Sequence, residues 1–440
     1  MNFRVVGLFF FSMIFLLSHA QDEYYFPPTE GNWTTQSPED LGWCVDSIDA
    51  LYDFLERNDT RAFLLLKDGR IVFEKYFYNF HQDSVWYWAS AGKTLTAFLA
   101  GTAQEQGYLS IDDPSSKYLG DWTSASTERE DSILIWHQLT MTTGLDDNVD
   151  NLDCTDRACL NYLADPGTRW SYHNAPYTLL SEVIEEATDQ NYNLFTRNSL
   201  MSKIGGSGAW IRLDYNRVFF SSPRTMARFG LLILARGEWG NERVMEDKQY
   251  IDQMISPSQQ INPSYGYLWW LNGQEGIMVP GVQRVFNQPL CPPAPDDMVA
   301  AMGKNSQLLN VVPSEGLVVV RMGESPSGAP VPFDLQDGIW EYLNQIICSP
   351  TNQEEVADNA NEIYPNPVVS GEVNIKTLTL GEPGVLRLND LSGRPVYERK
   401  CAGNEGWIDL PVVLANGLYT YSYQSRNGDV VFGKLIITGK

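Results

Sequence analysis

Residues 86–100 constrain the fold of this chain more than any other stretch of its sequence. An aromatic, strand-like run leads into Ser90, and apolar and small residues follow it in the pattern of a buried helix. Ser90 is therefore expected at a helix start. Because residues three apart share one helical face, the Lys93 amine lies beside the Ser90 hydroxyl. The first-turn N–H groups favour negative charge there, so the pair predicts an activated serine nucleophile.

The same pair has a simpler interpretation. Serine is a common helix N-cap, and Lys93 on the next turn is then a solvated surface charge. A Ser-x-x-Lys spacing occurs by chance about once in a chain of this composition. The pair alone does not define a site.

A second group of polar residues, 165–174, precedes a predicted helix. Its Pro-Gly step is typical of a tight turn, so Tyr172 and Asn174 are expected on a loop. A tyrosine near a lysine can have its pKa lowered enough to take a proton from a serine, and Asn174 then holds Lys93 and a substrate carbonyl. The alternative is a packed tyrosine and a capping asparagine. His173 is not assigned to a Ser-His-Asp triad, because it has no evident acidic partner and no Gly-x-Ser-x-Gly motif is present.

The hydrophobic pattern of the first 348 residues predicts an α+β fold. A strong turn signal, Asp68-Gly69, joins two strands as a hairpin. The region 112–209 is expected to be mainly helical with polar loops. The sheet is thus assembled from both ends of the domain, and its last helix is expected beside its first. The predicted helices are 45–58, 176–188, 224–236 and 335–347, and the predicted strands are 62–66, 71–78, 267–271, 298–303, 307–312 and 316–322.

Residues 1–20 have the pattern of a signal peptide, with Arg4, an apolar run over 5–17 and small residues before a polar segment. The apolar run is too short for a membrane span. The mature protein is therefore expected to be exported and to carry no integral membrane segment. Export permits disulfides, and Cys154 and Cys159 bracket a short loop and are the predicted pair. The sequence does not match the other four cysteines, which are Cys44, Cys291, Cys348 and Cys401.

A net charge of −24 disfavours nucleic acid and anionic membranes as partners. The histidines beyond the leader, His81, His137 and His173, have no ligand spacing with a cysteine. No metal and no cofactor are expected.

The composition changes after Cys348. Residues 349–361 are polar and acidic, as in a linker. Short strand-like runs then fill 362–440, with Asn427-Gly428 as a hairpin turn, and predict a small all-β, sandwich-like domain. The expected organisation is a leader at 1–20, a first domain at 21–348, the linker and this second domain.

In this order, Ser90/Lys93 and Tyr172/Asn174 resemble the Ser-x-x-Lys and Tyr-x-Asn motifs of the serine β-lactamase and penicillin-binding-protein superfamily, specifically its class C and esterase branch. The resemblance extends through residues 133–145 and covers roughly 40–348. It implies an antiparallel sheet with flanking and inserted helices. It also implies acyl transfer through a covalent acyl-enzyme on Ser90, with Lys93 and Tyr172 as the base pair.

The third motif of that superfamily aligns with residues 301–307. The resemblance implies that Gly303 leaves room for substrate and that the Lys304 N–H joins the Ser90 N–H in an oxyanion hole. Ala301 occupies the place of the usual cation, and strand alternation turns Lys304 to the other face. This favours the 6-aminohexanoate-dimer hydrolases and the promiscuous esterases of the branch over enzymes that bind a β-lactam carboxylate.

The second domain resembles the C-terminal sorting domain of type IX secretion cargo in its Tyr-Pro-Asn-Pro opening at 364–367, its Asn-Gly-Leu-Tyr at 416–419 and its terminal strand. The resemblance implies handling by the type IX machinery, passage through the periplasm, and release or anchoring at the outer-membrane surface. A carbohydrate-binding module is the alternative, because fold alone does not separate the two.

The sequence therefore predicts a secreted serine hydrolase that cleaves a small ester, amide or peptide-like substrate. Two alternatives stay open: a β-lactamase or D,D-peptidase, and a catalytically silent binding protein.

Overall fold

The computed structural model describes residues 24–325, 331–348, 362–364, 372–376, 383–389, 394–402, 408–409, 414, 417–425 and 430–437. The predicted signal peptide, the predicted linker and the Asn427-Gly428 turn lie outside these residues. The chain divides into two compact units, Met1–Ser349 and Pro350–Lys440, and each is described by itself.

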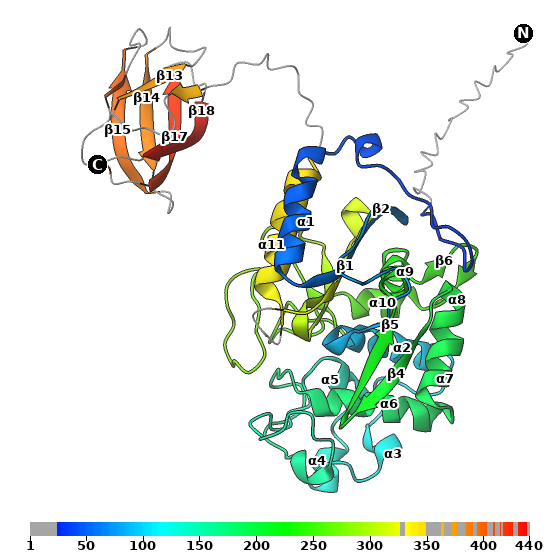
Figure 1. The fold of residues 1–440 in the computed structure, drawn as a ribbon. Coiled ribbons are helices and arrows are strands. Elements are labelled where there is room, and N and C mark those ends of the chain that lie inside the picture. The colour runs from blue at the N-terminus through cyan, green and yellow to red at the C-terminus, as the bar shows by residue number, and fades with distance from the viewer. Residues whose placement is uncertain are drawn as a thin grey trace, which may run out of the picture. The chain divides into compact units, whose positions relative to one another are not determined.

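Six antiparallel strands form the main sheet of the first unit, in the order β2-β1-β11-β10-β9-β8 (Figure 1). Early β1 lies between β2 and late β11, so the prediction of a sheet built from both ends of the domain is confirmed. In the β1–β2 turn, Asp68 and Gly69 have φ values of 49° and 83°, the left-handed conformation that the predicted hairpin requires. The strands are β1 (Thr60–Lys67), β2 (Arg70–Tyr76), β8 (Trp270–Leu271), β9 (Val299–Gly303), β10 (Gln307–Val312) and β11 (Leu317–Gly323).

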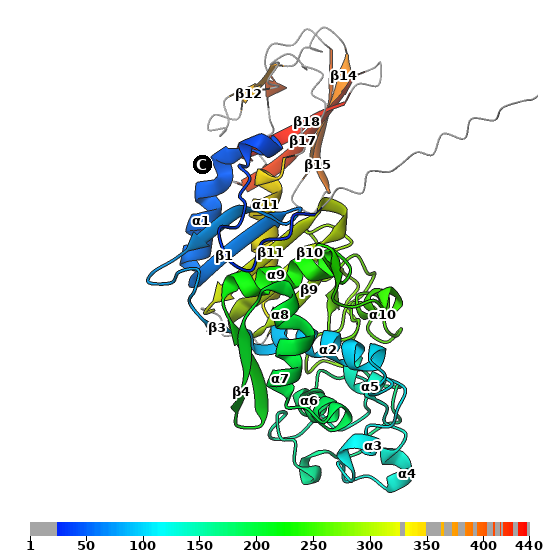
Figure 2. The same ribbon diagram turned by 90° about the vertical axis from the view of Figure 1, so that its right-hand side faces the viewer.

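Helices cover both faces of this sheet (Figure 2). The first helix, α1 (Ile48–Arg57), packs beside the last, α11 (Phe333–Ile346), as predicted, and the Phe54 and Tyr342 rings lie 5.0 Å apart. On the other face, α9 (Pro223–Leu234) packs against β1, β10 and β11. A disulfide between Cys44 and Cys348, a pair that the sequence did not match, joins the segment before α1 to the residues after α11.

Most of the remaining helices gather beyond one end of the sheet, around α2 (Figures 1 and 2). All α2 residues from Lys93 to Ala103 are buried, as the pattern of small and apolar residues predicts. Helices α6 and α10 pack against α2. The helices are α2 (Lys93–Glu105), α3 (Ser116–Leu119), α4 (Thr127–Glu130), α5 (Ile135–Leu139), α6 (Asn174–Thr188), α7 (Tyr192–Thr196), α8 (Ser202–Ile204) and α10 (Lys248–Met254).

The region expected to be mainly helical, 112–209, is followed by a β-hairpin that the sequence analysis did not predict. It consists of β4 (Gly208–Leu213) and β5 (Asn216–Ser221) and pairs with β3 (Trp86–Tyr87). One local prediction needs correction. The strand expected from residue 267 begins only at Trp270, because Leu268 has a φ of 61° and interrupts the extended backbone. A further short hairpin joins β6 (Glu238–Trp239) and β7 (Glu242–Arg243).

The second unit is all-β in its described residues, as predicted. One antiparallel sheet has the order β12-β13-β16 and the other β15-β14-β17-β18. Alternate residues Tyr419, Tyr421 and Tyr423 are buried with Leu386 and Leu388, which makes one face of the second sheet the core. The strands are β12 (Glu362–Tyr364), β13 (Glu372–Lys376), β14 (Gly384–Asn389), β15 (Pro395–Cys401), β16 (Ile408–Asp409), β17 (Gly417–Ser425) and β18 (Val430–Ile437). Among the helices of the described part of the chain, none is long and apolar enough to cross a membrane.

Candidate active site

A tight turn between β3 and α2 presents Ser90. The Trp88 N–H donates to Phe219 O of β5 at 2.8 Å, and the Trp88 indole donates to Ser221 Oγ at 2.8 Å. Ala89 then has a φ of 48°, and a 3₁₀ turn, Ala89–Gly92, leads into α2. A positive φ at a residue other than glycine is uncommon and is held here by these contacts on the preceding residue. Ser90 thus lies at the predicted helix start, on a fixed backbone.

Lys93 is buried beside Ser90, with 3% of its surface exposed. Its Nζ donates hydrogen bonds to Ser90 Oγ at 2.9 Å and to Asn174 Oδ1 at 2.8 Å. Burial lowers the pKa of Lys93 to about 7, although the Asp153 carboxylate acts in the opposite direction. The interpretation of Lys93 as a solvated surface charge is therefore wrong, and the amine is close to half neutral at neutral pH.

Tyr172 lies beside the same amine, with Lys93 Nζ 5.0 Å from the centre of its ring. The ring stacks on Trp270 at 5.8 Å and meets Tyr265 edge-on at 6.3 Å. Burial raises the pKa of Tyr172 to about 12, against the lowering effect of a hydrogen bond with Ser90. The lowered tyrosine pKa expected from the sequence is therefore wrong, because the loss of hydration outweighs the polar contact.

Asn174 is the first residue of α6, and both ends of its side-chain amide are engaged. Its Oδ1 accepts from Lys93, and its Nδ2 donates to Asp153 Oδ1 at 2.8 Å. The Asn174 side chain therefore spans the site and does not cap α6. His173 occupies the N-cap position of α6, and its side chain makes no capping hydrogen bond. The four motif residues meet in one place, although Asn174 and Lys93 are 81 residues apart in the chain.

His173, which the sequence analysis left out of the site, is buried with 2% of its surface exposed. Burial lowers its pKa to about 4, so the imidazole is neutral at physiological pH. Neither of its ring nitrogens has a hydrogen-bond partner among the described residues. A neutral imidazole without an acidic partner does not form a Ser-His-Asp triad.

Gly303 ends β9 directly against the Ser90 turn. A Cβ at this position would lie 2.5 Å from Trp88 O, 2.9 Å from Ala91 N and 3.1 Å from Ser90 N. These atoms are backbone and cannot swing aside, so only glycine allows the strand to come this close. The sequence prediction that Gly303 edges the site agrees with this geometry.

Lys304 begins a 3₁₀ turn, Lys304–Ser306, so strand alternation does not extend to it. Lys304 is exposed and lines the same pocket as Ser90. Ala301, in contrast, is buried in β9 opposite Leu309, as strand pairing requires.

Buried polar contacts hold the turn that carries Lys304. Asn305 Nδ2 donates to Tyr87 OH at 2.7 Å and to Glu324 Oε2 at 2.9 Å. Arg321, fully buried beneath the turn, donates to the backbone oxygens of Asn305 and Ser306 at 2.9 and 3.0 Å. The Lys304 backbone is therefore fixed relative to β3, which leads into the Ser90 turn.

The motif residues open into a pocket of about 420 Å³. Two of its charges are already paired, Asp147 with Arg169 and Arg217 with Glu185. A larger cavity of about 630 Å³ lies among the β1–β2 and β10–β11 turns and contains none of the motif residues. The pocket is lined by Tyr87, Ala89, Ser90, Lys93, Asp147, Leu152, Asp153, Tyr172, Asn174, Tyr177, Leu213, Asn216, Arg217, Val218, Pro280, Gly281, Lys304 and Val331.

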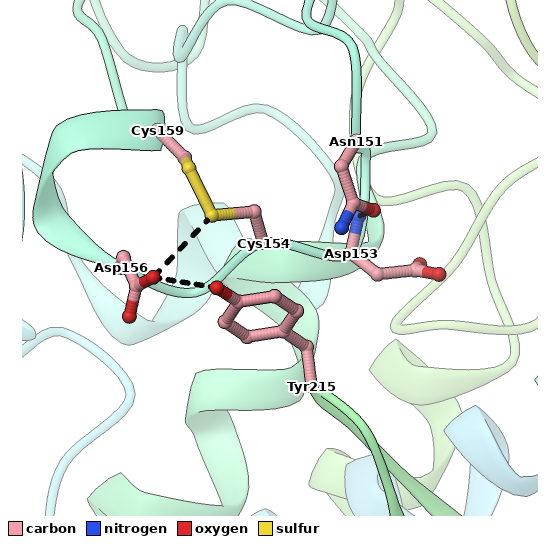
Figure 3. The surroundings of a disulfide bond; sticks show 6 residues. All are labelled: Asn151, Asp153, Cys154, Asp156, Cys159 and Tyr215. Carbon is pink, nitrogen blue, oxygen red and sulfur yellow. Dashed lines mark hydrogen bonds between the residues drawn. A yellow bond between two sulfur atoms is a disulfide. The ribbon is translucent and has the colours of Figure 1, made fainter.

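Sequence reasoning missed the outer wall of this pocket, which we define as residues 146–159 together with the β4–β5 hairpin. The predicted disulfide Cys154–Cys159 is present in it (Figure 3). Tyr215, at the tip of the hairpin, donates to Asp156 Oδ2 at 2.5 Å and so joins the two parts. Two β-prone runs on either side of Asp214-Tyr215 were the available signal for the hairpin, whereas Asp153 had no motif to mark it.

Comparisons with known proteins place this geometry in a class, the β-lactamase-like fold. A Bacteroides dorei DSM 17855 protein provisionally named a β-lactamase superposes with a TM-score of 0.55 at 17% identity over 69% of this chain and 99% of its own. A Bacillus anthracis protein provisionally named a 6-aminohexanoate-dimer hydrolase superposes with a TM-score of 0.54 at 16% identity, over 74% of this chain and 91% of its own. A family VIII carboxylesterase superposes with a TM-score of 0.51 at 12% identity, over 68% of this chain and 97% of its own. No curated protein matches the sequence.

The family follows from the sequence profiles. The Beta-lactamase profile matches residues 56–343, more than half of the chain, and the chain belongs to this family of serine hydrolases. The profile of the secretion system C-terminal sorting domain matches residues 362–438. That domain is handled by type IX secretion and indicates export to the cell surface or the medium.

Proposed function

We propose that this protein is a secreted serine hydrolase that cleaves small esters or amides through an acyl-enzyme on Ser90. The observation that carries the proposal is the 2.9 Å contact between Ser90 Oγ and the Nζ of a buried lysine whose pKa burial lowers to about 7. A neutral amine at that distance can accept the serine proton at physiological pH.

The reaction proceeds in two balanced steps. Lys93 Nζ takes the Ser90 proton while Oγ attacks the substrate carbonyl, and the backbone N–H groups of Ser90 and Lys304 stabilise the oxyanion. The leaving group departs with a proton supplied from Lys93 through the hydroxyl of Tyr172. Water then gives a proton to the amine as its oxygen attacks the acyl-enzyme, and the amine passes this proton to Ser90 Oγ as the acid leaves, which restores the serine hydroxyl and the neutral amine. Tyr172 keeps its own proton between these transfers, in line with its raised pKa.

The character of the pocket supports an uncharged, partly apolar substrate. Leu152, Leu213, Val218, Pro280 and Val331 line it, and Leu152 and Leu213 are among the exposed large apolar side chains of the described residues. The names of the 6-aminohexanoate-dimer hydrolase and the carboxylesterase with this fold fit an amide and an ester bond, respectively.

A second candidate is a β-lactamase or D,D-peptidase activity. Lys304 is exposed at the pocket, where its ammonium is available for a substrate carboxylate, and this observation favours the alternative. Against it, Ala301 occupies the strand position where the superfamily places its cation.

We also propose the order of the chain from leader to tail: a signal peptide at 1–20, a catalytic domain at 21–348, a linker at 349–361 and a sorting domain at 362–440. The protein then crosses the periplasm and the outer membrane and is released or held at the surface.

Probe labelling read by intact mass tests the proposal. A fluorophosphonate should add one adduct to the wild type, Ser90→Ala should add none, and the variant should lose about 10⁴-fold or more in hydrolysis of p-nitrophenyl acetate. A penicillin probe that labels Ser90 would favour the second candidate. No adduct with any acyl donor would show a catalytically silent binding protein.

A further inference from the structure

One carboxylate next to the motif residues has no place in the mechanism above. Asp153 lines the pocket and accepts a hydrogen bond from Asn174 Nδ2 at 2.8 Å. The other end of the same amide accepts from Lys93 Nζ at 2.8 Å, and Lys93 reaches Ser90 at 2.9 Å. An unbroken series of contacts therefore runs from Asp153 through Asn174 and Lys93 to Ser90.

We infer that Asp153 is a positioning residue, which fixes the orientation of the Asn174 amide and through it the place of Lys93. The inference rests on the proposed function. The two ends of an amide have nearly the same shape but opposite hydrogen-bonding character. A carboxylate only accepts, so Asp153 must receive the NH₂ group, and the carbonyl oxygen must then face Lys93. The reversed amide would direct N–H donors at an amine that is itself a donor.

The charge of Asp153 acts on the same amine. Lys93 Nζ is surrounded by Ser90 from the 3₁₀ turn before α2, by Tyr172 from the loop before α6, and by Asn174 and Tyr177 from α6 itself. All four are uncharged when the two tyrosines keep their protons. Burial raises the pKa of both tyrosines, which keeps them neutral. Asp153 is the charged group that acts on the pKa of Lys93, and it favours the ammonium that forms when Ser90 loses its proton.

The loop that carries Asp153 is anchored on both sides of it. The Asp153 N–H donates to Asn151 Oδ1 at 3.0 Å, and the Ala175 N–H of α6 donates to Leu152 O at 3.0 Å. Beyond Asp153, the disulfide at Cys154 and the contact between Tyr215 and Asp156 close the loop (Figure 3). This support lets an otherwise exposed segment hold one carboxylate in a defined place beside α6.

Two substitutions separate the roles of orientation and charge. Asp153→Ala removes both and should lower kcat/KM for p-nitrophenyl acetate about tenfold or more. Asp153→Asn keeps a hydrogen-bond acceptor but not the charge, so its loss should be smaller and the acidic limb of its pH profile should move to lower pH. Asp53→Asn makes the same chemical change at an exposed position of α1, outside the pocket, and should leave rate and profile as in the wild type.

The outcomes distinguish the two proposals. Failure of the wild type to label at Ser90 overturns the proposed function. The inference alone is overturned by a different combination of results. In it the wild type labels normally, the pH profile of Asp153→Asn superposes on that of the wild type, and the kcat/KM of Asp153→Ala stays within twofold of the wild-type value. Thermal melting of each variant shows whether a lost rate comes from lost folding, and a shifted pH limb in a stably folded Asp153→Asn cannot arise from misfolding.

Discussion

The inner wall of the pocket, formed by α2 and the end of β9, differs from the outer wall in what holds it in place. The inner wall is core: Lys93 is 3% exposed, and Gly303 leaves no space for a methyl group against the Ser90 turn. The outer wall contains exposed side chains such as Leu152 and Leu213 and is held by separate contacts, including one disulfide. Burial thus sets the surroundings of Ser90, the proposed nucleophile, while a small number of polar contacts sets the geometry of the wall opposite it.

This difference explains why the two walls can vary independently. A change in the inner wall disturbs packing that also sets the pKa of Lys93, so reactivity and stability change together. A change in the outer wall alters the reach and orientation of side chains that face the substrate, with less effect on the core. Variants of the two walls should therefore differ in which property they lose.

The largest effect is expected from Gly303→Ala in the inner wall. The added methyl would overlap Trp88 O, so either β9 or the Ser90 turn must move. We expect kcat/KM to fall about 100-fold or more through the displaced oxyanion donors, with a stability loss of about 1–3 kcal/mol. Gly92→Ala is the matched control, because its methyl meets Trp210 and Phe219 at 3.5–3.6 Å, an ordinary contact. Equal activity in the two variants would contradict the tight approach of β9.

Tyr172→Phe should have the next largest effect, about 100-fold on kcat, because it removes the hydroxyl that relays the proton and leaves the ring packing intact. Steady-state kinetics with p-nitrophenyl acetate measure it. Tyr265→Phe serves as the control: its ring packs against Tyr172, but its hydroxyl has no hydrogen-bond partner among the described residues. A comparable loss in both variants would assign the effect to packing.

The two disulfides should separate catalysis from stability. The double variant Cys154→Ser/Cys159→Ser loosens the outer wall and should lower kcat/KM several-fold, with a stability loss of about 2 kcal/mol for so short a loop. Cys44→Ser/Cys348→Ser opens a far longer loop, at a cost of about 5 kcal/mol, and should leave kcat unchanged below its melting temperature. Chemical denaturation and kinetics of both pairs check this, and the reverse pattern would show that the outer wall is not held by its disulfide.

Most of the fold and the inner wall could be predicted from the sequence, because their signals are local. The Asp68-Gly69 turn, the uniformly apolar face of α2 and the two short motifs each leave a pattern within a few residues. The outer wall could not, since Asp153 contacts the motif residue Asn174 from 21 residues away, and Tyr215 reaches Asp156 from a hairpin 59 residues further along the chain. The direction in which the pKa of Tyr172 shifts also depends on how deeply the ring is buried. The short motif that contains Tyr172 carries no signal of that burial.

The pH dependence of the acylation rate, measured in single turnovers with p-nitrophenyl acetate, tests the role of Lys93 most directly. Burial lowers the pKa of the amine to about 7, so below that value the free base should fall about tenfold per pH unit and the rate should fall with it. Above it the rate should stay level up to about pH 10, because Tyr172 keeps its proton until about 12. An acylation rate that does not level off near pH 7 and instead rises steadily up to pH 10 would contradict the role of Lys93 as the base. It would indicate that the phenolate of Tyr172 is the base.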